Sequence, residues 1–337
     1  MSARARAWLI PLFLPVGLCA MAASPAVSGT KYAAEFLRIG VGARALGMGG
    51  AFTAIADDAT AAYWNPAGIA RLDRPELLFQ HAEQFGTLAT HDYFGYVQPL
   101  MGGAGNSGTV GFSAVRFGVD NILVTKDGWR DTNNNGVVDE GDVIDTSLFR
   151  RESDTEWGIF FTYARPIGDR LRMGGNLKVV RQGLVGNTSF GMGADLGLLY
   201  ELRRDATLGI KFSDITTTQI SWDTGTREVV SPSITFGAQW TRQLAGLRSQ
   251  ITFAADIATT FDGRDTASQF GSGAAASDFQ GGMEYWFSHA VALRFGTNAG
   301  TWTGGGGLRY RAFEADYAFL PHDELQNTHR ISASVRF

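Results

Sequence analysis

The stretch 327-NTHRISASVRF-337 indicates the fold class of this chain. Apolar and polar residues alternate in it: Ile331, Ala333, Val335 and Phe337 alternate with Arg330, Ser332, Ser334 and Arg336. Successive side chains of a strand point to opposite faces, so this alternation predicts a strand with one apolar and one polar face. The same period of two recurs at 157–163, 251–257, 291–296 and 313–319.

The period of two, followed along the whole chain, predicts fourteen strands. They are expected at 75–83, 90–99, 108–118, 154–166, 170–182, 189–202, 205–214, 231–242, 249–259, 278–287, 290–298, 304–311, 313–320 and 327–337. Most have close to the roughly nine to eleven residues that a tilted strand needs to cross a bilayer. Aromatic residues near strand ends are typical of an aromatic girdle, for which we expect Tyr163, Tyr200, Trp240, Trp286 and Tyr310.

The connections between these strands alternate in length. Tight turns at 168–169, 203–204 and 288–289 are separated by long polar loops at 119–153, 215–230 and 260–277. Outer-membrane barrels have short periplasmic turns and longer outer loops, whereas a soluble sandwich has no reason to couple loop length to strand parity. We therefore predict an all-β fold: a 14-stranded antiparallel transmembrane β-barrel, residues 75–337, with a soluble sandwich or propeller as the alternative.

Composition agrees with a chain of many strands. The 337 residues are 45% hydrophobic and 18% charged, with 43 glycines and only 9 prolines. This is too apolar for a disordered chain and too polar for a bundle of membrane helices. The net charge of -4 gives no indication of a nucleic-acid partner.

The N-terminus has the order of a secretory signal peptide. Arg4 and Arg6 precede the apolar stretch 7–21, and small residues follow, among them Ala22 and Ala23. We predict a signal peptide at 1–22. The only cysteine, Cys19, lies inside it, so the exported chain is expected to have no disulfide.

Residues 23–74 lie outside the strand pattern, and we predict that they form a separate N-terminal segment. Asp57 or Asp58 is expected to cap a short helix that runs through 59–64. Pro66 should end that helix, because the residue before a proline avoids helical angles. The following motif is Asn65, Pro66, Ala67 and Gly68.

Two stretches resemble a known family. The run GARALGMGGAFTAIADDATAAYWNPAG at 42–68 looks like the signature of PorV/PorQ-type proteins, relatives of the FadL-type fatty-acid channels, and 308–337 looks like that family's last three strands. The resemblance implies a fourteen-strand outer-membrane barrel of Gram-negative type with residues 23–74 folded inside as a hatch. It also implies the hatch motif Asn65–Gly68, which we expect to act as a pivot.

The first long loop contains a calcium-binding pattern. Oxygen-bearing residues fall at positions 1, 3, 5, 7, 9 and 12 of a calcium loop, with Gly136 at position 6 for the turn. The predicted Ca²⁺ ligands are Asp131, Asn133, Asn135, the carbonyl of Val137, Asp139 and Asp142. Position 12 is Asp rather than Glu, and a plain Asn/Gly-rich hairpin tip is the alternative.

Several functions stay open at this point. The first is a barrel that passes or binds a hydrophobic small molecule in contact with outer-membrane lipid. The second is a PorV-like component of type IX protein secretion that binds secreted cargo, and the third is a purely structural barrel. We expect no enzyme, because the five histidines have no metal-ligand spacing and no nucleophile motif is present; a Ser/His pair at His329 is the alternative. The sequence leaves the oligomeric state open.

Overall fold

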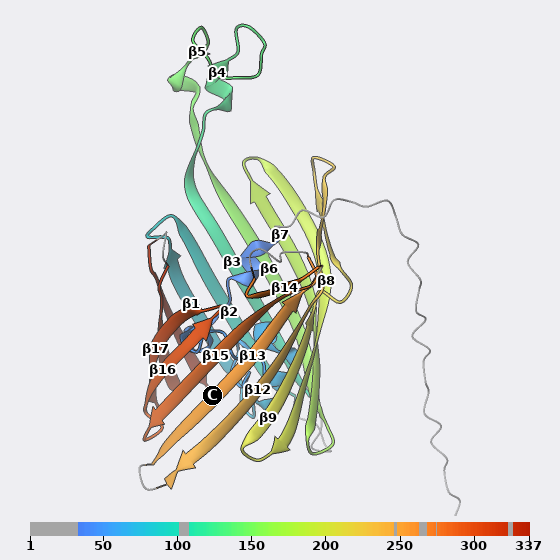
Figure 1. Cartoon of the computed structure of the whole chain (residues 1–337), viewed down its shortest axis with the longest axis vertical. Helices are drawn as coiled ribbons and strands as arrows, with labels where there is room; N and C mark the ends of the chain where they lie inside the picture. The colour runs from blue at the N-terminus through green and yellow to red at the C-terminus, as the bar shows by residue number, and fades with distance from the viewer. Residues whose placement is uncertain (1–32, 101–107, 246–247, 263–267, 274, 323–325) are drawn as a thin grey trace, which may run out of the picture.

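The computed structural model describes residues 33–100, 108–245, 248–262, 268–273, 275–322 and 326–337. These residues form a closed barrel of fourteen antiparallel strands (Figure 1). The barrel strands are β1 (Glu76–Gln84), β2 (Ala89–Pro99), β3 (Thr109–Val124), β6 (Arg150–Ile167), β7 (Leu171–Leu184), β8 (Asn187–Arg203), β9 (Ala206–Ser213), β12 (Ser233–Leu244), β13 (Ser249–Thr260), β15 (Ala275–Phe287), β16 (Val291–Asn298), β17 (Thr301–Tyr310), β18 (Phe313–Leu320) and β19 (Thr328–Arg336). Pairing of β1 with β19, from Glu76↔Arg336 to Glu83↔His329, closes the barrel. The predicted fold class is confirmed, and each predicted strand corresponds to one barrel strand.

The long loops contain short strands that the sequence pattern missed. β10 (Thr218–Trp222) and β11 (Arg227–Val230) form a hairpin that pairs with β8, and β14 (Phe270–Ser272) pairs with β15. β4 (Trp129–Arg130) and β5 (Val143–Ile144) form a separate two-stranded sheet, flanked by the 3-10 helices η3 (Lys126–Gly128) and η4 (Thr146–Leu148). Segments of two to five residues are too short to show a period of two.

The β3–β6 hairpin is longer than predicted. The sequence predicts ends at 118 and 154, but pairing continues to Val124↔Arg150, past a register shift between Val119 and Ile122. The hairpin carries the β4–β5 sheet beyond the other loops (Figure 1). The extension has no continuous apolar face, because Asp120 and Asn121 interrupt β3 and residues 150–153 of β6 are all polar.

The predicted alternation corresponds to the two sides of the wall, except at Trp286 and Phe160. Tyr163, Tyr200, Trp240 and Tyr310 are exposed on the outside, as an aromatic girdle requires. Trp286 was assigned to the girdle wrongly: it is buried inside, where the guanidinium of Arg309 lies 4.2 Å from its ring centroid. A cation over the ring stabilises it in that position.

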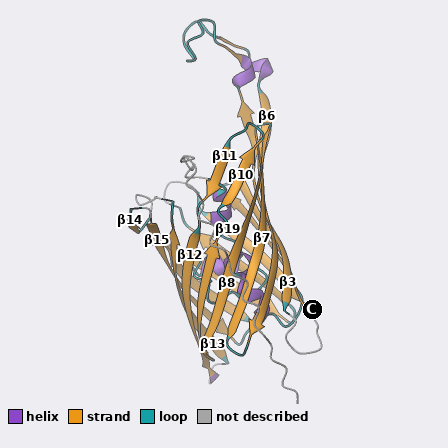
Figure 2. Ribbon diagram, turned by 90° about the vertical axis from the view of Figure 1, so that its right-hand side faces the viewer, coloured by secondary structure: helices purple, strands orange, loops and turns teal. Residues whose placement is uncertain are grey.

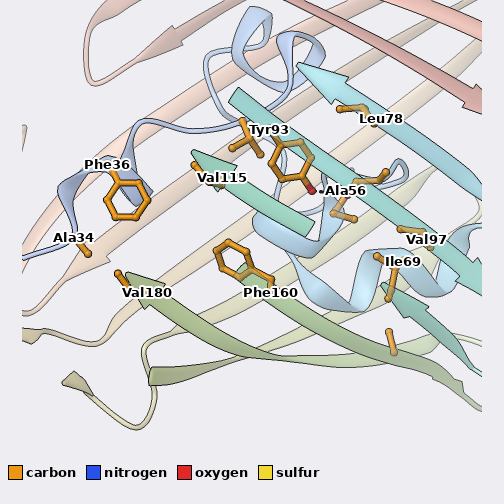
Figure 3. Packing of buried hydrophobic residues seen from close by; sticks show 14 of the residues in the cluster. Ala34, Phe36, Ala56, Ile69, Leu78, Tyr93, Val97, Val115, Phe160 and Val180 are labelled. Carbon is orange, nitrogen blue, oxygen red and sulfur yellow. Dashed lines mark hydrogen bonds between the residues drawn. The ribbon is translucent and has the colours of Figure 1, made fainter. Parts of the chain in front are cut away.

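The described part of the N-terminal segment lies inside the barrel (Figures 1 and 2). It is built of short pieces: η1 (Glu35–Arg38), α1 (Ala43–Gly47), α2 (Ala61–Trp64) and η2 (Pro66–Arg71). Its apolar side chains pack against inward-facing residues of β1, β2, β3, β6 and β7, among them Leu78, Tyr93, Val115, Phe160 and Val180 (Figure 3). This packing explains why Phe160 interrupts the alternation of β6: it points inward but contacts apolar residues rather than water.

No helix among the described residues is long and apolar enough to cross a membrane. The predicted signal peptide at 1–22 lies outside the described residues, and the boundaries predicted at 23 and 74 stay predictions.

Candidate functional site in the lumen

The Asn65–Gly68 motif lies against the inner surface of the wall. Pro66 ends α2 as predicted, and Asn65 is extended, with φ -161°. The Asn65 side chain is fully buried; its Nδ2 donates to the Thr53 carbonyl at 2.9 Å and to the Leu198 carbonyl of β8 at 3.1 Å. Gly68 is required by a close approach, since an added Cβ would lie 2.1 Å from the Ala56 carbonyl oxygen. The motif therefore ties the segment to β8.

The predicted capping of α2 by Asp57 or Asp58 differs in detail from the structure. The helix begins at Ala61 after Thr60, with no side-chain cap. Asp58 Oδ1 instead accepts from the Thr60 N–H at 2.8 Å, while Asp57 faces Arg44 at 2.5 Å. Asp57 therefore forms an ion pair with Arg44 of α1, within the segment itself.

Glycines of the wall allow the segment's backbone to lie directly on the sheet. An added Cβ at any of these would come within 3.0 Å of a backbone atom of the segment: Gly95, Gly174, Gly197, Gly209, Gly237, Gly282 and Gly296. They belong to β2, β7, β8, β9, β12, β15 and β16, so they line the lumen on most sides. Many of the 43 glycines thus serve the fit of the segment, which composition alone does not reveal.

An ion-pair network joins α1 to the wall. Arg44 forms a bidentate ion pair with Glu284, with Nε–Oε2 at 2.8 Å and Nη2–Oε1 at 2.9 Å. Glu284 also pairs with Arg294 at 2.7 Å, and Arg294 reaches Asp316 at 2.6 Å. Bidentate ion pairs are geometrically specific. Removal of one partner from a buried ion pair lowers the folding stability by about 3–5 kcal/mol. This network fixes the rotation of α1.

Wall side chains also bond to the segment's backbone. Arg330 Nη1 donates to the Gly40 carbonyl at 3.0 Å, and Arg336 Nη2 donates to the Asp57 carbonyl at 3.2 Å. Asp256 Oδ2 accepts from the backbone N–H groups of Phe52 and Thr53 at 3.0 and 2.8 Å. The segment has little regular structure, so the wall satisfies backbone groups that a helix or sheet would otherwise pair.

A cavity of about 300 Å³ remains in the lumen beside the segment. Tyr63 and Trp64 of α2 and Phe160 of β6 form its aromatic part, with Tyr63 and Phe160 ring centroids 6.4 Å apart. One feature of the sequence indicated this site: Phe160 is apolar at an inward position of β6. Tyr63 and Trp64 were missed as lining residues because they lie outside the strand pattern.

The facing wall of the cavity is charged. Lys178 pairs with Asp195 at 3.1 Å and with Asp214 at 2.6 Å. Lys211 Nζ donates to the Tyr63 carbonyl at 2.6 Å and lies 5.0 Å from the Tyr63 ring centroid. The cavity can therefore accept a small molecule with an apolar body on one side and polar contacts on the other.

The predicted calcium loop is folded around its own side chains. Gly136 has φ 74° and donates its N–H to Asp131 Oδ2 at 2.7 Å. Asn133 and Asn135 both donate to Asp139 Oδ2, at 2.9 and 2.6 Å. The structure thus brings these three side chains together.

Asp142 accepts hydrogen bonds from the start of the loop and from the Asp139 N–H. It accepts hydrogen bonds from the Thr132 N–H at 3.0 Å and from the Trp129 indole at 2.8 Å. These hydrogen bonds lower the pKa of the Asp142 carboxyl. The described residues contain no group of three or more His, Cys, Asp or Glu side chains placed to hold a metal ion. Calcium binding stays a prediction.

His329 and Arg311 lie away from the lumen. His329 is on the outer face, with Nδ1 2.7 Å from the Tyr317 hydroxyl. Arg311 is exposed in the turn after β17, where φ is 57°, and its guanidinium carbon lies 5.3 Å from the Tyr310 ring centroid.

Comparison with known proteins shows similarity mainly at the level of fold. A family model described as "Uncharacterised protein family (UPF0164)" matches residues 16–137, less than half of the chain. No curated protein gives a significant match.

Solved structures give the closer comparison. The toluene transporter TodX of P. putida is 14% identical with a TM-score of 0.55, over 88% of this chain and 99% of that one. The monoaromatic hydrocarbon channel CymD is 13% identical with a TM-score of 0.54, over 89% and 98%. The specific resemblance to PorV/PorQ proteins is not among these findings. The chain shares the fourteen-strand barrel fold of the FadL-type hydrocarbon channels.

Proposed function

We propose that this protein is an outer-membrane channel that passes a small hydrophobic molecule, with the N-terminal segment as its gate. The observation that carries the proposal is the aromatic cavity of Tyr63, Trp64 and Phe160, formed where the segment meets the wall. The exposed apolar outer face supports insertion in a Gram-negative-type outer membrane. The names of the structural neighbours, a toluene transporter and a monoaromatic hydrocarbon channel, support a hydrocarbon as the cargo.

Filling the cavity should block passage. Ser233 lines the cavity from β12 and makes no contact that holds the segment among the hydrogen bonds described. We expect Ser233→Trp to reduce uptake of toluene into liposomes to the level of protein-free vesicles, because the indole occupies the space beside the aromatic rings. Ser233→Ala is the matched control and should transport normally. Equal uptake by both variants would place the path elsewhere and remove the basis for this function.

The Asn65–Gly68 motif is proposed as the pivot of the gate. Its support is the junction that it forms between α2 and η2, next to the wall. Movement about this bend must break the bond from Asn65 to Leu198, so Asn65→Ala should raise the frequency of channel openings in single-channel recordings. An unchanged opening frequency would assign the motif to anchoring alone.

We also propose that the 131–142 loop binds calcium outside the cell. Support comes from its oxygen-rich side chains and from the hydrogen bond by which Asp131 holds the turn at Gly136. Trp129 lies next to Asp142 and can sensitise terbium, which replaces calcium. We expect terbium luminescence on excitation of tryptophan, displaced by calcium and abolished by Asp131→Ala, which removes a charged ligand. Luminescence that persists in Asp131→Ala would mean that the loop is only a turn.

The secretion alternative makes a separate prediction. Val137, Val138 and Ile144 are exposed by 62%, 61% and 54% on the protruding loop, which is a feature of a protein-binding surface. A secreted protein that co-purifies with the wild type and is lost from Val137→Ser/Val138→Ser would favour this alternative over transport.

A further inference from the structure

A cluster of charged residues interrupts the outer face of the barrel at β1, β2 and β3. His81 Nδ1 lies 2.7 Å from Asp92 Oδ1, and Arg116 Nη1 lies 3.3 Å from Asp92 Oδ2. The three residues are cross-strand neighbours in register, and their side chains are 51%, 24% and 31% exposed. Glu83 of β1 is paired in register with His329 of β19, and these two residues extend the cluster.

The cluster begins partway up the wall. On β1 the outward apolar residues are Leu77 and Phe79, and His81 follows. Outward residues are about 6.8 Å apart along a strand. With a tilt of about 40°, two of them cover roughly 10 Å of the approximately 25 Å apolar band. On β8, in contrast, outward residues stay apolar from Phe190 to Tyr200. Acyl chains are therefore a poor environment for this part of the wall.

Aromatic rings lie directly below the cluster. Phe79 is paired in register with Phe94, and the ring centroids of Phe94 and Phe112 are 6.4 Å apart. All three side chains are exposed, by 54%, 39% and 37%. Phenylalanine rings beside an arginine are the composition of a protein–protein interface core rather than of a lipid-facing surface alone.

We propose that this face is an interface between two copies of the chain in the membrane. A two-fold interface brings the same patch of each copy together in opposite order. The patch carries both signs of charge, so Arg116 of one copy can approach Asp92 or Glu83 of the other. Asp92 and Glu83 would repel the phosphates of a lipid headgroup, which makes a second copy the better occupant. The inference uses the membrane location proposed above but not the transported molecule.

Site-specific disulfide formation tests this interface. Because Cys19 is the only cysteine, Cys19→Ser gives a cysteine-free chain into which single cysteines can be placed. Phe79→Cys and Phe94→Cys should form covalent dimers on oxidation in isolated outer membranes. Phe236→Cys on β12 is the matched control, since Phe236 is 49% exposed on the far side of the strand order. Equal cross-linking at Phe236, or none at Phe79 and Phe94, would overturn the proposal.

Subunit counting gives a second, independent readout. Single-molecule photobleaching in phosphatidylethanolamine/phosphatidylglycerol vesicles should show two copies for the wild type. His81→Leu/Asp92→Leu/Arg116→Leu should weaken association by at least about tenfold, a change of roughly 1.4 kcal/mol. The variant should keep its folded electrophoretic mobility, because leucine suits a lipid-facing position. Wild-type monomers, or dimers that the triple variant leaves unchanged, would overturn the proposal. Wild-type monomers that retain a lipid in native mass spectrometry, lost in the triple variant, would assign the face to lipid instead.

Discussion

Deletion of residues 31–70 should convert a barrel whose lumen is filled by the N-terminal segment into an open pore. A barrel of about eight strands is filled by its own side chains, whereas one of about sixteen leaves an aqueous channel. Fourteen strands without the segment should therefore leave a wide lumen, in which charged side chains such as Glu284 and Arg294 regain water. We expect the variant to insert in liposomes and to release small hydrophilic dyes that the wild type retains.

Two further observations make this deletion decisive. Insertion is checked by heat-modifiable electrophoretic mobility, which separates a folded barrel from an unfolded one. A folded variant that retains the dyes as the wild type does would reject gating and shift support to the protein-binding alternative. A variant that does not insert would identify the segment as part of the barrel core, in agreement with its extensive apolar packing.

Gly296→Val should displace the segment without removing it. A Cβ at Gly296 would lie 2.3 Å from the backbone nitrogen of Gly49 and 2.3 Å from the carbonyl carbon of Met48. Overpacking typically costs about 1–3 kcal/mol, and backbone atoms cannot rotate away as a side chain can. We expect a lower unfolding temperature, cleavage of the segment by added trypsin at Arg44, and leakage of the same dyes.

Gly304→Val is the matched control for this variant. Gly304 lies on the adjacent strand β17, and an added Cβ there would meet only the Arg294 carbonyl oxygen, at 3.9 Å. This variant should therefore resist trypsin and retain dyes. If both valine variants behave alike, the effect comes from loss of glycine in the sheet and not from contact with the segment.

The sequence determined the barrel almost completely. The alternation in 327–337 and in the other strands predicted all fourteen barrel strands, because each residue of a membrane-spanning strand faces either lipid or the lumen. Loop parity predicted which connections are long. The hydrophobic period failed where one face of a strand stops meeting lipid, as in the extension of β3 and β6 beyond the wall, and at the apolar inward residues Phe160 and Trp286.

Tertiary structure alone decided how the lumen is filled. Many inward positions of the strands are polar, charged or glycine, and others, such as Val115 and Val180, are apolar and contact the segment. None of these residue types carries a periodic signal that identifies its partner. The pair of Arg44 with Glu284 joins residues 240 positions apart, and the contact of Gly296 with Gly49 spans most of the chain. The buried Trp286 and the cluster at His81 were hidden for the same reason. Both features depend on which strands become neighbours and on what lies next to the wall. A local sequence pattern contains no information on either point.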